Sequence, residues 1–164
     1  MKDKNGFLLG EETLKIIIAV ICILFLVYLL VALYFSVTGA QKTKEAAMSM
    51  NLISNEAKRI DANGLYNEQG ILIPNPSDWY IFSFTGNEKK PSSCVSENCV
   101  CICKNILIDN IPLIASNRQA KACDDNGACA VIVNLKEFQK IKIEKNGVWI
   151  LINKINEQIE ITRK

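Results

Sequence analysis

The sequence predicts an α+β fold, in which a long N-terminal membrane-spanning α-helix packs against a C-terminal antiparallel β-sheet domain with disulfides. Three observations support this fold class. Residues 16–35 form an unbroken run of twenty apolar residues, long enough to cross a bilayer core about 30 Å thick. After residue 65 the apolar residues alternate with the period of two that is typical of strands. Six of the seven cysteines also lie in this second region.

The apolar run and the change of period divide the chain. We expect a transmembrane segment at residues 7–39, an extramembrane helix at 40–64 and a disulfide-stapled β-sheet head at 65–164. Between residues 13 and 61 there is no proline, and the only glycine is Gly39. This composition predicts one helix that runs from about residue 8 to residue 62, because proline and glycine are the residues that interrupt helices.

The extramembrane part of this helix carries an apolar stripe. Five apolar residues recur there at spacings of four, three, four and three, namely Ala46, Met50, Ile53, Ala57 and Ile60. This spacing places them on one helix face that must be buried against something. Gly64 is expected to end the helix as a left-handed cap.

Seven segments of the second region read as strands, at residues 70–74, 79–85, 99–103, 128–135, 140–144, 148–152 and 158–162. Lys145-Asn146-Gly147 lies between two of them, and its Asn-Gly pair predicts a β-hairpin. We expect a single antiparallel sheet packed on the helix stripe. Tyr80, Phe82 and Phe84 fall on one face of a strand. They favour a core position over an exposed sugar-binding or adhesion surface.

An even set of six cysteines follows the apolar run: Cys94, Cys99, Cys101, Cys103, Cys123 and Cys129. Such a set beyond a membrane segment is typical of a disulfide framework in an oxidising compartment. The alternatives are a zinc or iron–sulfur site in a cytosolic domain, or free thiols. An extended strand spaces alternate residues about 6.5 Å apart on one face, and this spacing disfavours tetrahedral zinc.

The same strand geometry limits the disulfide pairing. Strand cysteines at that spacing cannot bond to one another, because a disulfide needs Cβ atoms about 3.8 Å apart. Each then takes a partner from the other three cysteines, which excludes a Cys123–Cys129 bond. The favoured arrangement is a local Cys94–Cys99 bond, with Cys101 and Cys103 bonded in either order to Cys123 and Cys129.

Charge and composition exclude several function classes. Nineteen Lys and Arg against seventeen Asp and Glu give a net charge of +2, and no basic block is present, which disfavours nucleic-acid binding. The chain has no histidine, so Ser-His-Asp and Cys-His catalysis are excluded. The sequence has no Cys-x-x-Cys motif, and only Lys104 lies close to the strand thiols, which disfavours a thiol–disulfide oxidoreductase. We expect a protein that is not an enzyme, with no cofactor, no metal and no small-molecule substrate.

The N-terminus carries a more specific motif. A short basic leader ends in Gly6, Phe7 follows, and Glu11 stands five residues after the glycine, just before the apolar run. This arrangement resembles the type IV pilin superfamily of pilins, pseudopilins and their archaeal relatives. The resemblance implies that residues 1–6 are a class III signal peptide, and that a membrane-embedded prepilin peptidase cuts between Gly6 and Phe7.

The resemblance also implies a role for Glu11. Cleavage would leave a positive α-amine on Phe7, and burying that charge unpaired in a filament core costs several kcal/mol. In the family, the glutamate at the fifth mature position of a neighbouring subunit neutralises the amine. The alternative is that Glu11 and Lys15, one turn apart, pair within an ordinary membrane helix.

These features together predict a pilin-like structural subunit of a cell-surface filament or secretion pseudopilus. Its expected partners are the membrane, the prepilin peptidase, and copies of itself or related pilins. Charge is similar on both flanks of the apolar run, so the cysteines decide the orientation, with the C-terminal domain extracellular or part of a surface filament. The alternative is an uncleaved single-pass anchor that carries an extracellular binding or adhesion module.

Overall fold

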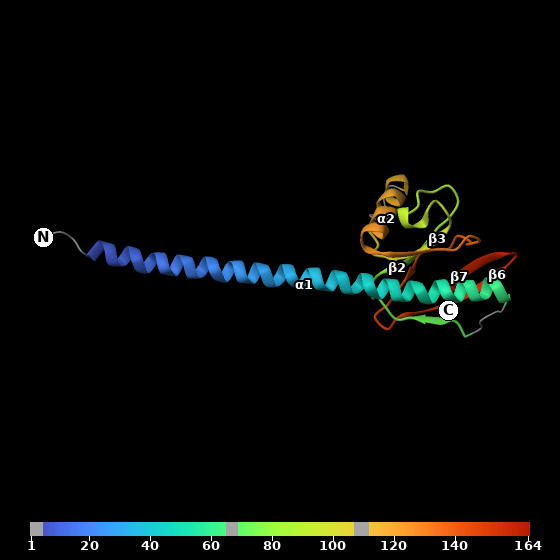
Figure 1. The fold of residues 1–164 in the computed structure, drawn as a ribbon, viewed down its shortest axis with the longest axis horizontal. Helices are drawn as coiled ribbons and strands as arrows, with labels where there is room; N and C mark the ends of the chain where they lie inside the picture. Colours follow the sequence, from blue (N-terminus) through green and yellow to red (C-terminus); the bar gives the residue numbers. More distant parts are fainter. Residues whose placement is uncertain (1–4, 65–68, 107–111) are drawn as a thin grey trace. The chain divides into compact units, whose positions relative to one another are not determined.

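The structure, a computed structural model, describes residues 5–64, 69–106 and 112–164, without the side chains of residues 5–12 and 112–116 (Figure 1). The first element is helix α1 (Asn5–Asn63). The chain divides into two compact units, Met1–Ala40 and Gln41–Lys164. The boundary lies one residue from the expected end of the transmembrane segment. The second half of α1 belongs to the same unit as the sheets, which we call the head.

The apolar stripe predicted on the second half of α1 is confirmed. Its five residues, from Ala46 to Ile60, are each at most 3% exposed. They form one hydrophobic core with buried residues from both sheets, which include Ile73, Val100 and Ile150. Gly64 ends the helix as expected, with a positive φ of 63° and its N–H donating to the carbonyl of Ile60 at 2.9 Å.

Seven strands are assigned in the described part of the head. They are β1 (Ile71–Ile73), β2 (Tyr80–Phe84), β3 (Cys99–Cys103), β4 (Ala128–Val131), β5 (Ile141–Lys142), β6 (Val148–Ile155) and β7 (Gln158–Arg163). The α+β class and the antiparallel pairing are confirmed, but the expected single sheet is wrong. The strands form two sheets, with the orders β1-β6-β7 and β4-β3-β2-β5. The local periodicity of the sequence predicts where each strand lies, but it does not indicate which strands pair with each other.

The hairpin predicted at Asn146-Gly147 is also wrong. The turn exists, since the N–H of Gly147 donates to the carbonyl of Glu144 at 3.0 Å. However, β5 pairs with β2, whereas β6 pairs with β1 and β7, so this turn passes from one sheet to the other. The tight hairpin is β6–β7, and its turn residues Asn156 and Glu157 both have positive φ, as a type I′ turn requires.

A second helix, α2 (Pro112–Asn126), and a short 3₁₀ helix, η1 (Ser92–Cys94), were not predicted. Among the residues of α2 whose side chains are described (117–126), the buried ones are Gln119, Ala120 and Cys123, which are small or polar. Such residues give little hydrophobic periodicity in the sequence. The one local signal was Pro112, because proline is favoured at the first position of a helix.

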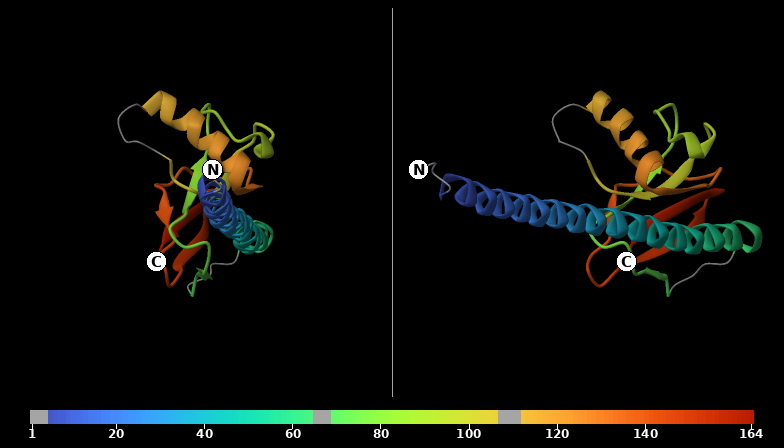
Figure 2. Two further views of the ribbon diagram at one scale, coloured as in Figure 1. Left: turned by 90° about the vertical axis from the view of Figure 1, so that its left-hand side faces the viewer. Right: turned by 60° about the vertical axis from the view of Figure 1, so that its left-hand side comes forward.

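The four-stranded sheet is buried on both faces. Val100 and Ile102 of β3 face the core shared with α1, whereas the cysteines of β3 face a second core. In Figures 1 and 2, α2 and the second half of α1 lie on opposite sides of this sheet. Phe82 and Phe84 belong to the second core and are 7% and 3% exposed, so they form a core rather than a binding surface.

Candidate functional site

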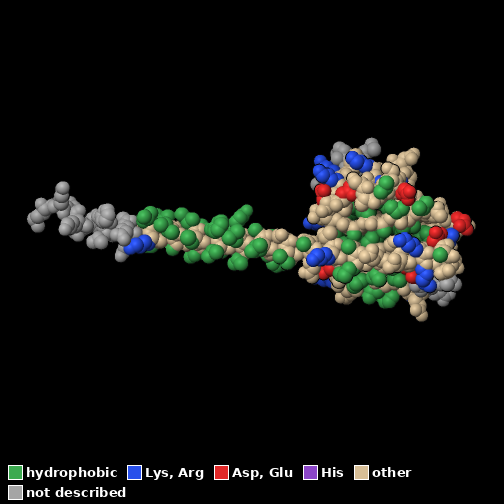
Figure 3. Space-filling model, in the orientation of Figure 1, with side chains coloured by type: hydrophobic (Ala, Val, Ile, Leu, Met, Phe, Trp, Pro, Cys, Tyr) green, Lys and Arg blue, Asp and Glu red, His purple; other side chains and the backbone are tan. Residues whose placement is uncertain are grey.

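The first half of α1 exposes apolar side chains on every side. All large apolar residues from Leu14 to Val37 are exposed, and no residue of the most apolar window of the helix is buried. Hydrophobic side chains cover this half of the helix in Figure 3. By length and composition, the helix is able to cross a membrane. A helix that is apolar all round needs apolar surroundings on all sides, unlike a surface helix with a single stripe.

The predicted processing and pairing residues lie at the start of this helix. Gly6, Phe7 and Glu11 fall within the bounds of α1. Their side chains are outside the part of the chain that the structure describes, so the geometry of Glu11 and of the cleavage position stays a prediction. The free cysteine Cys22 lies in the apolar half and is exposed.

The head carries three disulfides, Cys94–Cys99, Cys101–Cys129 and Cys103–Cys123. The local bond is the one that the sequence favoured, and the structure gives the order that the sequence left open. Cys101 and Cys129 are directly opposite each other on the paired strands β3 and β4, with Cα atoms 4.1 Å apart. The remaining strand cysteine, Cys103, joins the end of β3 to α2. The register of the strands and the position of α2 therefore decide the pairing.

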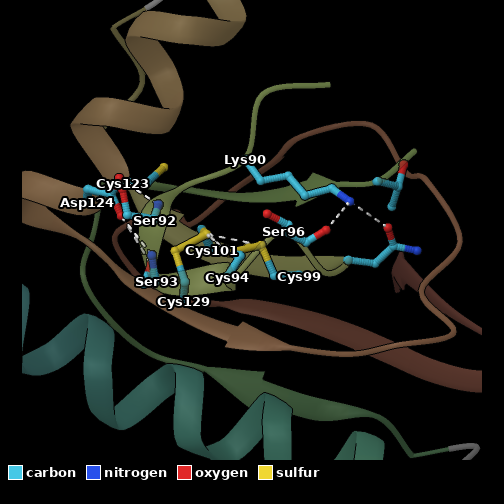
Figure 4. The surroundings of a disulfide bond; sticks show 12 residues. Lys90, Ser92, Ser93, Cys94, Ser96, Cys99, Cys101, Cys123, Asp124 and Cys129 are labelled. Atoms are coloured by element: carbon cyan, nitrogen blue, oxygen red, sulfur yellow. Dashed lines mark hydrogen bonds between the residues drawn. A yellow bond between two sulfur atoms is a disulfide. The ribbon is translucent and has the colours of Figure 1, made fainter. Parts of the chain in front are cut away.

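Two of the disulfides lie against each other in the second core (Figure 4). The sulfurs of Cys94, Cys101 and Cys129 lie within 4.8 Å of one another, and those of Cys99 and Cys101 are 4.0 Å apart. The side chains thus bring the strand sulfurs closer than the spacing of their backbone positions. A metal would need thiolates. Sulfurs that are bonded in disulfides act instead as a staple for the core.

Gln119 connects α2 to the chain that follows β3. Its side-chain amide nitrogen donates to the carbonyl of Lys104 at 2.9 Å and lies 3.2 Å from the sulfur of Cys103. Its side-chain oxygen accepts from the N–H of Ile106 at 3.1 Å. Gln119 is only 3% exposed, and these bonds satisfy a polar group that would otherwise be costly to bury.

Asp124 connects α2 to η1. Its carboxylate accepts hydrogen bonds from the backbone N–H groups of Ser92 and Ser93, at 2.8 and 3.2 Å. Partial burial opposes ionisation, but the hydrogen bonds from these two serines outweigh it and lower the pKa of Asp124. The carboxylate is therefore engaged in holding the fold together.

The elements of the candidate site are thus an apolar helix segment and a head with three disulfides. Comparison with protein-family models, with curated proteins and with solved structures finds no match to this chain.

Proposed function

We propose that this chain is a pilin-like structural subunit of a cell-surface filament or a secretion pseudopilus. The observation that carries the proposal is the contrast between the two halves of α1. The first half exposes apolar side chains all round, and the second half buries a single stripe in the core of the head. One continuous helix thus supplies both an assembly segment and the central helix of a folded domain.

The apolar half has two environments open to it. Lipid covers it when the subunit is a single-pass membrane protein, and the same half of neighbouring copies covers it in a filament. When the subunit moves from lipid into a filament, the α-amine exposed by cleavage between Gly6 and Phe7 must pair with a negative charge. Glu11 supplies that charge from an adjacent subunit, because an unpaired amine in an apolar core is strongly destabilising.

The head supports a structural role over a catalytic one. Its sulfurs are paired, and all of them but that of Cys129 are at most 1% exposed. An exchange enzyme needs an accessible thiolate with a lowered pKa. Three disulfides instead suit a domain that must stay folded in an oxidising space outside the cell.

N-terminal sequencing of the protein from native membranes tests the processing step. We expect the mature chain to begin at Phe7. A chain that keeps its first six residues and stays monomeric in the bilayer supports the other reading, a membrane-anchored binding or adhesion module.

Glu11→Ala tests the assembly step, with Glu12→Ala as the matched control one residue away. Both variants should insert into the membrane and be processed. Filament incorporation should be lost in Glu11→Ala and kept in Glu12→Ala, as judged by the amount of protein in sheared surface fractions. Equal incorporation of the two variants would rule out the pairing role of Glu11.

A further inference from the structure

We propose that the part of the head nearest in the chain to the apolar segment binds the anionic headgroups of the bilayer. This inference rests on the membrane anchoring in the proposed function. It adds a contact between the head and the lipid headgroups, which would have to break when the subunit enters a filament. It concerns a surface within the head, formed by the first turn of α1 after Gln41, the loop before β2, and strand β5. We call this surface the basic patch and define it by Lys42, Lys140 and Lys142.

Chain length places the basic patch within reach of the headgroups. Lys42 follows Phe35, the last residue of the apolar run, by seven residues. Seven residues span at most about 25 Å when fully extended and about 10 Å as a helix. The headgroup layer is about 5–7 Å thick on each side of the hydrocarbon core. The chain length therefore allows Lys42 to reach the headgroups but does not by itself hold it there.

Contacts within the head connect Lys42 to β5, the strand that contains Lys142 and directly follows Lys140. The ammonium of Lys42 donates to the carbonyl of Ser77 at 3.5 Å. The next residue, Asp78, forms an ion pair with Lys142 of β5 at 3.2 Å. The hydroxyl of Ser49 on α1 holds the same loop by donating to the carbonyl of Asn75 at 2.6 Å. The loop before β2 is thus a bridge between α1 and β5.

A preformed groove opens beside Lys140 and Lys142. It has a volume of about 440 Å³ and lies along β5 and the end of β7, where Tyr80, Lys140, Lys142 and Arg163 line it. The ammonium of Lys140 lies 5.8 Å from the centre of the Tyr80 ring. The hydroxyl of Ser83 bonds to both the N–H and the carbonyl of Phe138, which fixes the segment that leads into β5.

The charges of this groove suit an anion. Three of its nine lining residues are cations and none is a carboxylate. The nearby carboxylates Asp78 and Glu144 form exposed ion pairs with Lys142 and Arg163. Exposed pairs of this kind contribute little stability, so a lipid phosphate can take over either cation. Tyrosine is also enriched where membrane proteins meet the headgroups.

Amine footprinting of the full chain in nanodiscs tests this contact. Lysines are acylated in discs of phosphatidylcholine alone and in discs that also contain phosphatidylglycerol, and labelling is read by mass spectrometry. We expect labelling of Lys140 and Lys142 to fall at least threefold in the anionic discs. Lys89 and Lys121, on the loop before η1 and on α2, should be labelled equally in both. High salt should reduce the protection.

A double variant supplies a second readout. Lys140→Gln with Lys142→Gln should abolish the lipid-dependent protection of Lys42, whereas the matched pair Lys89→Gln with Lys121→Gln should leave it unchanged. Protection of Lys42 that survives the first pair would overturn the role of the groove.

Three other outcomes would contradict the proposal. Unchanged labelling of a chain that stays in the discs overturns the headgroup contact and leaves the anchoring intact. A chain that does not co-purify with the discs overturns both the contact and the proposed function. Protection by inorganic phosphate in phosphatidylcholine discs would show a site for soluble anions instead of lipid.

Discussion

The carboxylate of Asp124, in the last turn of α2, accepts a hydrogen bond from the backbone N–H of Ser92 at 2.8 Å, across 32 residues of sequence. A second bond comes from the N–H of Ser93. The residue that precedes η1 is Pro91, whose side chain makes no capping bond. Asp124 therefore acts as an N-cap supplied by another element, and it holds α2 close to the Cys94–Cys99 loop.

Asp124→Ala should lower the free energy of unfolding of the head by about 1 kcal/mol near neutral pH, the usual effect of removing an N-cap. The neighbouring variant Asp125→Ala is the control and should change it far less. Chemical unfolding of the detergent-solubilised chain, followed by circular dichroism, measures both. A larger loss for Asp125→Ala would contradict the capping role.

The Asp124 contribution should also depend on pH. Its pKa is lowered in the folded protein. The stabilisation is therefore complete above the unfolded pKa of about 3.9 and is lost as the pH falls through the lower folded pKa. The difference in stability between the native chain and Asp124→Ala should be constant from about pH 7 to about pH 5 and should shrink towards about pH 2. A difference that grows in acid would show that another group is responsible.

Ile53→Ala should destabilise the head by about 2–5 kcal/mol, because it removes a fully buried side chain from the core between α1 and the sheets. Leu52→Ala, on the next residue of the same helix, is the matched control. Leu52 is 50% exposed, so its loss should cost much less. Comparable losses for the two variants in urea unfolding would mean that the helix does not pack through this stripe.

Removing the disulfide of α2 with Cys103→Ser and Cys123→Ser should lower stability by about 3 kcal/mol, the loop-entropy value for a closed loop of about this length. Hydrogen exchange should rise most in α2. The control Cys22→Ser removes a free cysteine outside the head and should change neither quantity. If the hydrogen exchange of α2 is unchanged in the double variant, the hydrogen bonds of Gln119 and Asp124 are sufficient to hold α2 against the rest of the head.

Gly127→Ala should destabilise the junction between α2 and β4. An added Cβ would lie 2.5 Å from the carbonyl oxygen of Cys123 and 2.8 Å from the Cβ of Cys103, so backbone would have to move. We expect a loss of about 1–3 kcal/mol. Gly39→Ala is the control, since its Cβ would meet nothing within 4 Å, and alanine favours a helix interior. Thermal unfolding should separate the two variants in opposite directions.

Elements with a strong local period were predictable. The stripe from Ala46 to Ile60 and the alternation of β3 each repeat every turn or every second residue, and a buried face requires such a repeat. Helix α2 was not predictable in this way. Over residues 117–126, where its side chains are described, the buried residues are Gln119, Ala120 and Cys123, and hydrogen bonds and a disulfide hold them in place.

The candidate site was predictable to different degrees. Gly6, Phe7 and Glu11 were found because their spacing before the apolar run is a local motif. The basic patch was not found, because Lys42 lies nearly a hundred residues before Lys140 and Lys142, and the loop at Ser77 and Asp78 connects it to Lys142 only in the folded chain. A local pattern cannot reveal cations that the fold collects from distant segments.

The amino-acid sequence alone determined that this protein has one long apolar helix, that the second half of this helix must be buried along one stripe, and that six cysteines gather in the domain beyond it. Contacts between distant segments fix the division of the strands into two sheets, the position of α2 over the cysteine face, and the choice between the two longer cysteine pairings. The physical reason is the range of the interactions. Helix and strand periods arise from neighbouring residues. Strand pairing and disulfide choice depend on contacts between residues that are far apart in the sequence, and these contacts form only when the chain folds.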